Sequence, residues 1–230
     1  MLARSGAGIE QSWCSTTYLL DLLFTHKNQP ETLIKLYISG NSPYARRARL
    51  AVREGGLTEK VEEIAIKSLD QLQEIGVGQK IPVLICDDGT SLCESLIITH
   101  YLNDLADGTL MPRDKVAAMK TLELEAVASV LMDSHYVRSS EKYRRDKEHQ
   151  SADLLAREQS RANSCYDRLN VLVADEGEQI TLATIAVISA LDYANWRHAE
   201  DEWRHGRDAL ATYYERISQR PAFAETAPKY

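Results

Sequence analysis

In the first half of the chain, apolar residues gather in short β-rich runs that are separated by turn residues. The first run ends at Ser39-Gly40, and residues 87–90 read Asp-Asp-Gly-Thr, a hairpin turn that joins the last two runs. Their β-branched and aliphatic content predicts a strand for each run. The predicted strands are residues 33–38, 61–66, 82–86 and 91–93.

Helical periodicity fills the gaps between these strands. Residues 43–55 carry an apolar stripe, mostly alanine, at spacings of three and four residues. The predicted helices are residues 43–55, 68–75 and 95–106. The resulting order β-α-β-α-β-β-α predicts a compact α/β domain over residues 32–110.

After residue 110 the pattern changes to helical periodicity alone. The predicted helices of this part are residues 116–143, 151–174, 182–195 and 207–220. An α/β half followed by an all-α half predicts two domains, and the second is a helical bundle over residues 111–230.

The first 31 residues differ from the rest and predict an extension outside the fold, or a misassigned start codon. The apolar stretch at residues 18–24 is too short for a signal peptide, and only Arg4 supplies a positive charge before it. A short helix on the surface is the alternative interpretation.

Composition excludes several classes of protein. Lys+Arg 27 against Asp+Glu 34 gives a net charge of −7, which disfavours a dedicated nucleic-acid binder or an anionic-membrane binder. No apolar run is long enough to predict a transmembrane helix. The four cysteines form no C-x-x-C pair and no zinc-like cluster, so we expect a reducing compartment and no metal. Cys86 and Cys93 lie in apolar stretches and are expected to be small core residues.

Candidate chemistry begins at Ser42. A serine before Pro43 at the start of a helix is a good N-cap, and its hydroxyl lies at the positive end of the helix, a place that suits a bound anion. The alternative interpretation is that Ser42 only caps the helix.

Two other segments lie at comparable junctions. Pro82 opens a strand, and a cis bond before it would leave the Ile81 backbone free to pair with a ligand. Glu94 and Ser95 stand where the last strand gives way to a helix, near the positive helix end. Each segment alone also has an ordinary structural interpretation.

Together, three motifs resemble those of glutathione transferases. They are S-P-x-x-R at residues 42–46, K-I-P-V-L at residues 80–84 and E-S-x-x-I-x-x-Y-L at residues 94–102. The resemblance covers residues 33–224 and implies a thioredoxin-like glutathione-binding domain followed by a helical domain. It is closest to a bacterial-like cytosolic type with serine at the thiol-activating position.

The resemblance implies a role for each matching residue. Ser42 would donate a hydrogen bond to the glutathione thiol and favour its thiolate, with Asn41 as the rival donor. Members with cysteine at this position act as reductases, so Ser42 disfavours that activity.

The rest of the glutathione site follows from the other two motifs. Lys80 would lie near the glycine end, and the Ile81 backbone would pair with the cysteinyl part beside a cis Pro82. Glu94 would face the γ-glutamyl ammonium group, and Ser95 its carboxylate.

Other positions carry weaker expectations. Met132, His135 and Tyr136 lie mid-helix and would line a pocket for the electrophile, with plain core packing as the alternative. Four arginines on the first helix are interpreted as solvated or interface charges, with nearby glutamates as possible partners. They are Arg46, Arg47, Arg49 and Arg53.

One departure from the family pattern concerns the second domain. Thr184 stands where the capping box usually has aspartate, so the reciprocal bond to Thr181 is expected to be weak.

The sequence therefore predicts a cytoplasmic glutathione transferase that moves alkyl or aryl groups in detoxification. Glutathione would be its co-substrate, a small apolar electrophile its partner and a homodimer its assembly. Two alternatives remain open: a non-catalytic glutathione-binding or regulatory protein on the same fold, and a glutathione-dependent ether-cleaving enzyme.

Overall fold

The computed structural model describes residues 33–75 and 77–228. The extension expected at residues 1–31, its alternative as a surface helix, and Cys14 lie outside the described residues. From residue 33 onward, every predicted strand and helix is present, with ends that move by one or two residues.

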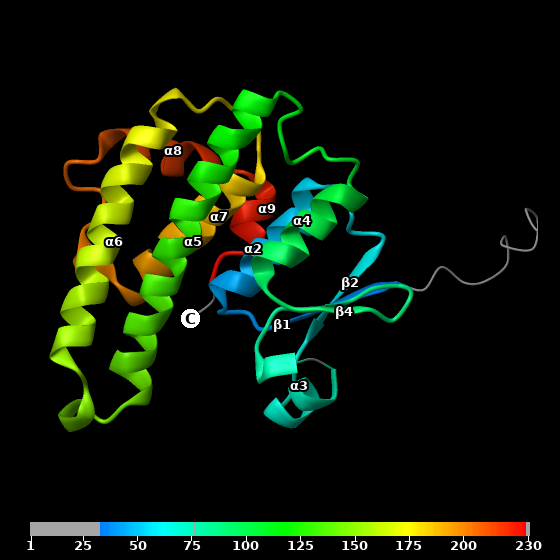
Figure 1. Cartoon of the computed structure of the whole chain (residues 1–230), viewed down its shortest axis with the longest axis horizontal. Helices are drawn as coiled ribbons and strands as arrows, with labels where there is room; N and C mark the ends of the chain where they lie inside the picture. The colour runs from blue at the N-terminus through cyan, green and yellow to red at the C-terminus, as the bar shows by residue number, and fades with distance from the viewer. Residues whose placement is uncertain (1–32, 76, 229–230) are drawn as a thin grey trace, which may run out of the picture. The chain divides into compact units, whose positions relative to one another are not determined.

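Four strands form one sheet in the order β2-β1-β3-β4. The strands are β1 (Ile34–Ile38), β2 (Val61–Ala65), β3 (Val83–Ile85) and β4 (Ser91–Leu92). β1 is parallel to β2 and antiparallel to β3, and β3 is antiparallel to β4 (Figure 1). In β1 the alternate residues Ile34, Leu36 and Ile38 are buried, as the period of two in a strand requires.

Helices complete the α/β half. They are α2 (Pro43–Glu54), α3 (Leu69–Ile75), the short 3-10 helix η1 (Val77–Gln79) and α4 (Ser95–Leu105). Ala45, Ala48 and Ala51 are fully buried on α2. Their small side chains let α2 contact both α4 and α7.

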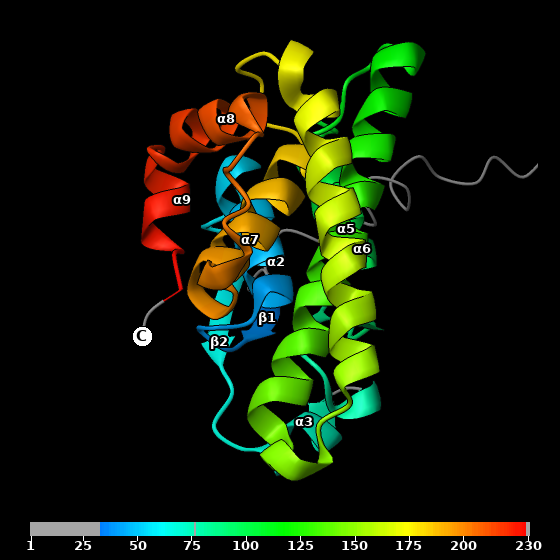
Figure 2. The same cartoon turned by 90° about the vertical axis from the view of Figure 1, so that its left-hand side faces the viewer.

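The second half of the described chain is helical. Its elements are α5 (Lys115–Arg144), η2 (Lys147–His149), α6 (Ala152–Leu172), η3 (Val173–Asp175), α7 (Leu182–Arg197), η4 (Ala199–Asp201), α8 (Asp208–Ser218) and α9 (Pro221–Glu225). α5 and α6 run side by side (Figure 2). α9 was not among the predicted helices, and Pro221 at its first position suits a helix start because the missing N–H costs nothing there.

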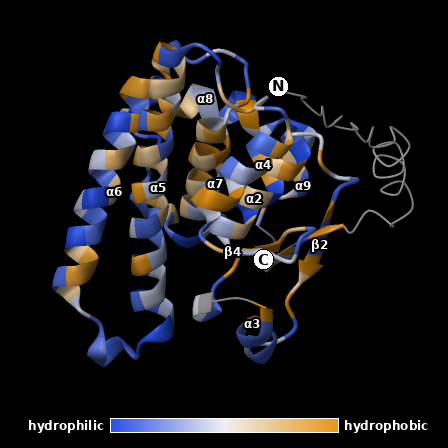
Figure 3. Cartoon of the chain, turned by 45° about the vertical axis from the view of Figure 1, so that its right-hand side comes forward, coloured by the Kyte–Doolittle hydropathy of each residue, from blue (hydrophilic) through white to orange (hydrophobic). Residues whose placement is uncertain are grey.

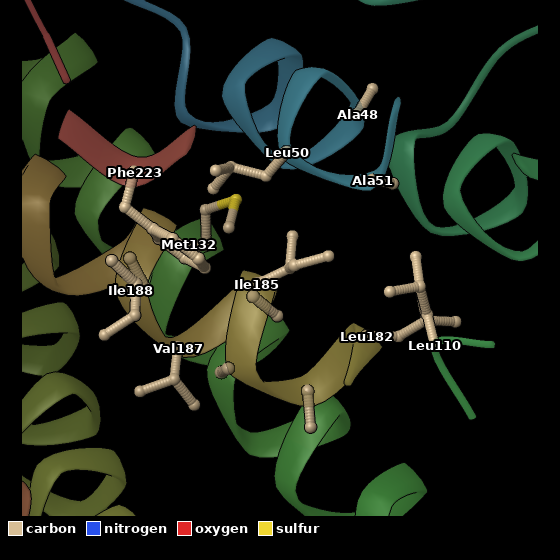
Figure 4. Packing of buried hydrophobic residues seen from close by; sticks show 14 of the residues in the cluster. Ala48, Leu50, Ala51, Leu110, Met132, Leu182, Ile185, Val187, Ile188 and Phe223 are labelled. Atoms are coloured by element: carbon tan, nitrogen blue, oxygen red, sulfur yellow. The ribbon is translucent and has the colours of Figure 1, made fainter. Parts of the chain in front are cut away.

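α7 is the central helix of the core. Its residues are mostly hydrophobic around the whole helix (Figure 3), and nearly all of them are buried. Leu50 of α2, Met132 of α5, Ile185 of α7 and Phe223 of α9 gather in one cluster (Figure 4). One hydrophobic core therefore spans both halves, and the domain boundary near residue 110 stays a prediction.

Of the two roles expected for the α2 arginines, solvated or interface charges, the solvated role is wrong for Arg46 and Arg47, which are buried where α2 meets the helical half. Each is 2% exposed. Arg46 pairs with Asp192 of α7 and donates to the Phe223 carbonyl oxygen at 2.9 Å and to Thr226 Oγ1 at 3.3 Å. The α/β half is thus tied to the helices that end the described chain.

The other two arginines on α2 pair with a residue that is near them in the sequence. Arg49 and Arg53 both bind Glu63 of β2, one of the nearby glutamates expected as partners. Arg47 pairs instead with Glu125 of α5, a residue far away in the sequence.

The capping box at the start of α7 is complete although it lacks the usual aspartate. The Thr184 N–H donates to Thr181 Oγ1 at 3.2 Å, and the Thr181 N–H donates to Thr184 Oγ1 at 3.1 Å. Ile180 and Ile185 on either side are buried. The hydroxyl of Thr184 therefore supplies the reciprocal bond that aspartate would make.

No helix within residues 33–75 and 77–228 is both long and apolar enough to cross a membrane.

Candidate functional site

Three chain segments converge at one edge of the sheet. Tyr37 near the end of β1 lies opposite Val83 at the start of β3, because the two strands are antiparallel. Leu92 at the end of β4 lies opposite Leu84, so β4 returns to the same edge. This edge therefore brings together the starts of α2, β3 and α4, where the sequence places its candidate residues (Figure 1).

Ser42 is the N-cap of α2. The Ala45 N–H donates to Ser42 Oγ at 3.2 Å, and Pro43 occupies the first helical turn. A hydroxyl has one donor and two acceptor sites, so capping uses only the oxygen and leaves the O–H free to donate. Ser42 is partly exposed, and Asn41 is exposed in the turn before it. Both residues that could donate a hydrogen bond to a thiol are therefore accessible to solvent.

The second segment runs from Lys80 to Pro82. The Ile81–Pro82 peptide bond is cis, which confirms the expectation for this position. Ile81 is partly buried, whereas Lys80 is exposed. Ile81 precedes β3 and lies outside its ladder, so its backbone takes no part in the strand pairing.

The third segment carries an unusual backbone conformation. Glu94 has φ +69° and ψ 113°, a region that non-glycine residues rarely adopt. Its exposed side chain makes no capping hydrogen bond, and Ser95 behind it is buried as the first residue of α4. Strain of this kind is retained where the surrounding structure requires it, often at binding sites.

α5 contacts the start of α2 through Tyr136, which the sequence analysis names, and through Asp133, which it does not. The Tyr44 hydroxyl on α2 donates to Asp133 Oδ1 on α5 at 2.6 Å. The ring of Tyr44 meets the ring of Tyr136 edge-on, with centroids 5.8 Å apart. The available signals were the position of Tyr44 two residues after Ser42 and the placement of Asp133 and Tyr136 one turn apart on α5.

The three residues expected to line the electrophile pocket differ in their exposure. Tyr136 is partly exposed beside α2, so it remains a candidate lining residue. Met132 and His135 have no exposed surface, which corrects the expectation that their side chains line a pocket. Met132 belongs to the hydrophobic core, as the alternative interpretation held.

His135 belongs to a buried polar cluster in the helical half. Its Nε2 lies 2.7 Å from the Tyr166 hydroxyl oxygen, and its carbonyl oxygen accepts from His198 Nε2 at 2.9 Å. Burial lowers the pKa of His135 to about 3 and the pKa of His198 to about 4. Both rings are therefore neutral in the folded protein at neutral pH.

These two histidines predict acid-sensitive stability. Below pH of about 6.5 the unfolded chain protonates both rings while the folded protein does not, so unfolding takes up protons. The free energy of unfolding should fall as pH drops from about 6.5 to about 5, with a slope that approaches about 1.4 kcal/mol per pH unit for each histidine. Urea unfolding across this interval measures the slope, and ordinary carboxylates titrate mostly below it.

The control for this prediction is His149→Gln, because the His149 side chain is 69% exposed. This variant should keep the slope of the unchanged protein. A free energy of unfolding that stays constant between pH of about 6.5 and 5 would contradict the prediction.

The two cysteines that the sequence predicts as core residues lie in different environments. Cys86 is buried, as expected, but Cys93 is exposed, so its prediction as a core residue is wrong. β4 ends at Leu92, and the side chain of the following residue no longer packs under the sheet. Cys93 directly precedes Glu94, between β4 and α4. It is not at the start of α2, where Ser42 lies.

Two cavities lie in the helical half, away from this sheet edge. One of about 260 Å³ lies between η3 and α8, and one of about 380 Å³ lies beside the loop from α7 to α8. Within the described residues, no cluster of three or more His, Cys, Asp or Glu side chains is arranged to hold a metal ion.

Comparison with known proteins gives a consistent picture. Residues 36–110 match the family described as glutathione S-transferase, N-terminal domain. Among curated proteins, the chain is 29% identical over 200 residues to the uncharacterized GST-like protein YibF of Escherichia coli K12. That alignment covers 85% of this chain and 98% of the relative.

Solved structures extend the similarity over both halves. A glutathione transferase family member from Pseudomonas fluorescens Pf-5 with bound glutathione is 30% identical, with a TM-score of 0.81. The match covers 86% of this chain and 100% of that one. A glutathione S-transferase from Methylobacterium radiotolerans in complex with glutathione sulfonate is 28% identical, with a TM-score of 0.78, covering 86% and 96% of the two chains. The predicted fold class, a thioredoxin-like sheet domain followed by a helical region, is confirmed.

Proposed function

The chain belongs to the glutathione transferase family, and we propose that it binds glutathione at the sheet edge and transfers it to a small apolar electrophile. The observation that carries this proposal is the hydrogen bonding of Ser42. Its oxygen caps α2, while its hydrogen is free to donate toward a sulfur at the helix N-terminus. Glutathione in one related structure and glutathione sulfonate in another support the same assignment.

The proposed chemistry depends on the thiol pKa. A free thiol with a pKa of about 8.5 is only a few per cent thiolate at neutral pH, and the thiolate is the nucleophile. Donation from Ser42 and the positive end of the α2 dipole stabilise the anion.

The proposed transfer then proceeds in one displacement. The thiol proton passes to solvent, and the sulfur donates an electron pair to an electrophilic carbon. A carbon–sulfur bond forms as the carbon–leaving-group bond breaks, and the leaving group departs with its electron pair. The product carries the alkyl or aryl group on glutathione, with no covalent enzyme intermediate.

The peptide part of glutathione uses the other two segments. The Ile81 backbone pairs with the cysteinyl part beside the cis Pro82, and Lys80 lies near the glycine carboxylate. The Glu94 carboxylate pairs with the γ-glutamyl ammonium group, and Ser95 with its carboxylate. Glutathione is anionic and so is the protein overall, so these local donors must outweigh the net charge of −7.

Replacing the acidic group of this site should weaken glutathione binding. Glu94→Gln keeps the shape but removes the charge that pairs with the ammonium group, and we expect a rise in Kd of about tenfold. Isothermal titration calorimetry measures it. Glu148→Gln, at an exposed glutamate of η2, is the matched control and should leave Kd unchanged. Equal affinities for the two variants would remove Glu94 from the site.

A homodimer is part of the proposal. Large apolar side chains are exposed on two helices, a feature of surfaces that associate. They are Leu96 and Ile97 on α4, and Met119, Leu122 and Val130 on α5. A cytoplasmic location and a role in detoxification are proposed from family membership.

One experiment tests the function and separates it from its alternatives. The protein is titrated with glutathione by calorimetry, and the ultraviolet absorbance of bound thiolate is followed against pH. A panel of electrophiles is then incubated with glutathione and enzyme, and products are identified by mass spectrometry. Thioether products support transfer, and a released phenol would mark ether cleavage. Thiolate binding without product would favour the regulatory alternative, and no binding would refute the proposal.

A further inference from the structure

Glu125 on α5 binds one residue of each helix that begins at the proposed glutathione site. Arg47 of α2 donates to Glu125 Oε1 at 2.5 Å, and His100 Nε2 of α4 lies 2.9 Å from Glu125 Oε2. Each oxygen of this carboxylate therefore contacts a different helix. The side chains of Glu125 and Arg47 are each 2% exposed, whereas the side chain of His100 is 37% exposed and reaches solvent.

These two contacts fix the starts of α2 and α4 relative to each other. Arg47 lies five residues after Ser42, and His100 lies five residues after Ser95. Each contact is therefore about 7.5 Å along its helix from a residue proposed to bind glutathione. Because hydrogen bonds join every turn of an α-helix, a shift of α4 at His100 also moves Ser95 relative to Ser42.

α4 has fewer polar ties to the helical half than α2 has. Arg46 binds α2 to α7 and to residues 223–226. Among the residues that the structure describes, the bond between His100 and Glu125 is the one hydrogen bond that joins a side chain of α4 to the helical half. The start of α4 is also strained, since Glu94 has φ +69°, and such a conformation persists only where the surrounding structure holds it.

The contact between α4 and α5 responds to pH. The hydrogen bond to Glu125 raises the pKa of His100 above its ordinary value. Burial alone would raise the pKa of Glu125, but the bond from His100 and the charge of Arg47 hold it below its ordinary value, so this carboxylate is charged at neutral pH. A protonated His100 therefore makes a charge-assisted bond to Glu125, and this bond weakens as pH rises through the pKa of His100.

Two further charged groups face His100 and act in opposite directions. Arg47 on α2 opposes its protonation, and Asp104 on its own helix favours it. α4 also packs against β3, which carries no ionisable side chain, and against α7, whose carboxylate Asp192 pairs with Arg46 instead. The carboxylate on α5 is thus the acidic group that His100 contacts.

We propose that Glu125 is a positioning residue for glutathione, holding the starts of α2 and α4 at the separation that the ligand spans, and that protonation of His100 tightens glutathione binding. The inference rests on the proposed function, because it concerns the same site. Glu125 acts through the two helices and not by touching the ligand. Since protonated His100 favours the position of α4 that binds glutathione, bound glutathione in turn favours protonated His100.

The test uses S-methylglutathione, whose sulfur has no proton to lose. Calorimetry on the full chain gives its Kd between pH of about 6 and 8, and the Kd should rise by about 2- to 5-fold as His100 loses its proton. His100→Gln is always neutral, so its Kd should stay at the weaker value throughout. His149→Gln is the matched control, because the His149 side chain is 69% exposed in η2, and it should keep the rise.

A second measurement reads the same coupling from the protein. An NMR titration of the His100 ring, assigned by its absence in His100→Gln, gives its pKa with and without S-methylglutathione. The pKa should be higher in the complex by about 0.3 to 0.7, the logarithm of the expected change in Kd. Glu125→Gln should weaken binding by about 5- to 20-fold and remove its pH dependence. His100→Gln keeps the test decisive if Glu125→Gln fails to fold.

The outcomes are distinguishable. If the unchanged protein binds neither glutathione nor S-methylglutathione, the proposed function fails and the positioning role fails with it. If it binds both, but the Kd of S-methylglutathione is the same at pH of about 6 and 8, only the positioning role is overturned. A full rise in Kd that persists in His100→Gln would also overturn it, because another group would then cause the pH dependence.

Discussion

Replacing Arg47 by methionine should lower the free energy of unfolding by about 3–5 kcal/mol. The Arg47 guanidinium donates to Glu125 Oε1 at 2.5 Å and to Ser129 Oγ at 3.1 Å. The side chains of Arg47 and Glu125 are each 2% exposed. Without Arg47, His100 at 2.9 Å is the one side-chain partner that the buried Glu125 carboxylate keeps among residues 33–75 and 77–228. The free-energy cost of desolvating this carboxylate is then no longer offset by the ion pair. This cost is the source of the lower free energy of unfolding.

Urea denaturation at neutral pH measures this change. The matched control is Arg220→Met, which breaks a pair with Glu54, also between α2 and a distant helix, but Arg220 is 45% exposed. A pair open to water contributes about 0–1 kcal/mol, so the control should cost little. The double variant Arg47→Met/Glu125→Leu removes the orphaned charge and should recover most of the loss. A single-variant loss no larger than that of the control would show that the pair contributes little.

Ser42→Ala should raise the pKa of the bound glutathione thiol by about one to two units and lower kcat/KM at neutral pH by about 10- to 100-fold. The variant removes the free O–H donor beside the proposed sulfur position and leaves the helix N-terminus in place. Glutathione binding should persist, because the proposed site holds the peptide part with the other two segments.

The structure supplies a close control for this variant. Ser151 caps α6 in the same way, accepting from the Leu154 N–H at 3.2 Å, the distance also found between Ala45 and Ser42. Ser151→Ala should therefore cost a similar cap energy, about 1 kcal/mol, with no change in thiol pKa. The ultraviolet absorbance of bound thiolate against pH reads the difference. An unchanged pKa in Ser42→Ala would move the role to Asn41 or to the helix N-terminus alone.

Local patterns were sufficient to predict the order of the strands and of the α-helices from residue 33 as far as α8. Caps, turns and periodicity act within a few residues, so the sequence places the starts of α2, β3 and α4 correctly. The convergence of these starts at one edge came from the family resemblance, because strand pairing joins residues that local patterns do not connect.

What the sequence did not predict depends on distant partners. Arg47 appears solvated until Glu125, 78 residues later, is known to lie against it. His135 appears available until the helices that bury it are placed. The Tyr44–Asp133 bond spans 89 residues, and neither residue carries a local signal of the other. Thr184 is a different case, since a hydroxyl can replace a carboxylate in a capping box.

The buried Arg46 has a consequence for the order in which the protein folds during synthesis. Its partners Asp192, Phe223 and Thr226 lie 146, 177 and 180 residues further along the chain. Until the ribosome has released those residues, the first helix of the α/β half emerges with a charged side chain that has no place in a core. The N-terminal half should therefore complete its native packing only after these partner residues have left the ribosome, and chaperones that bind emerging chains should find this half still open.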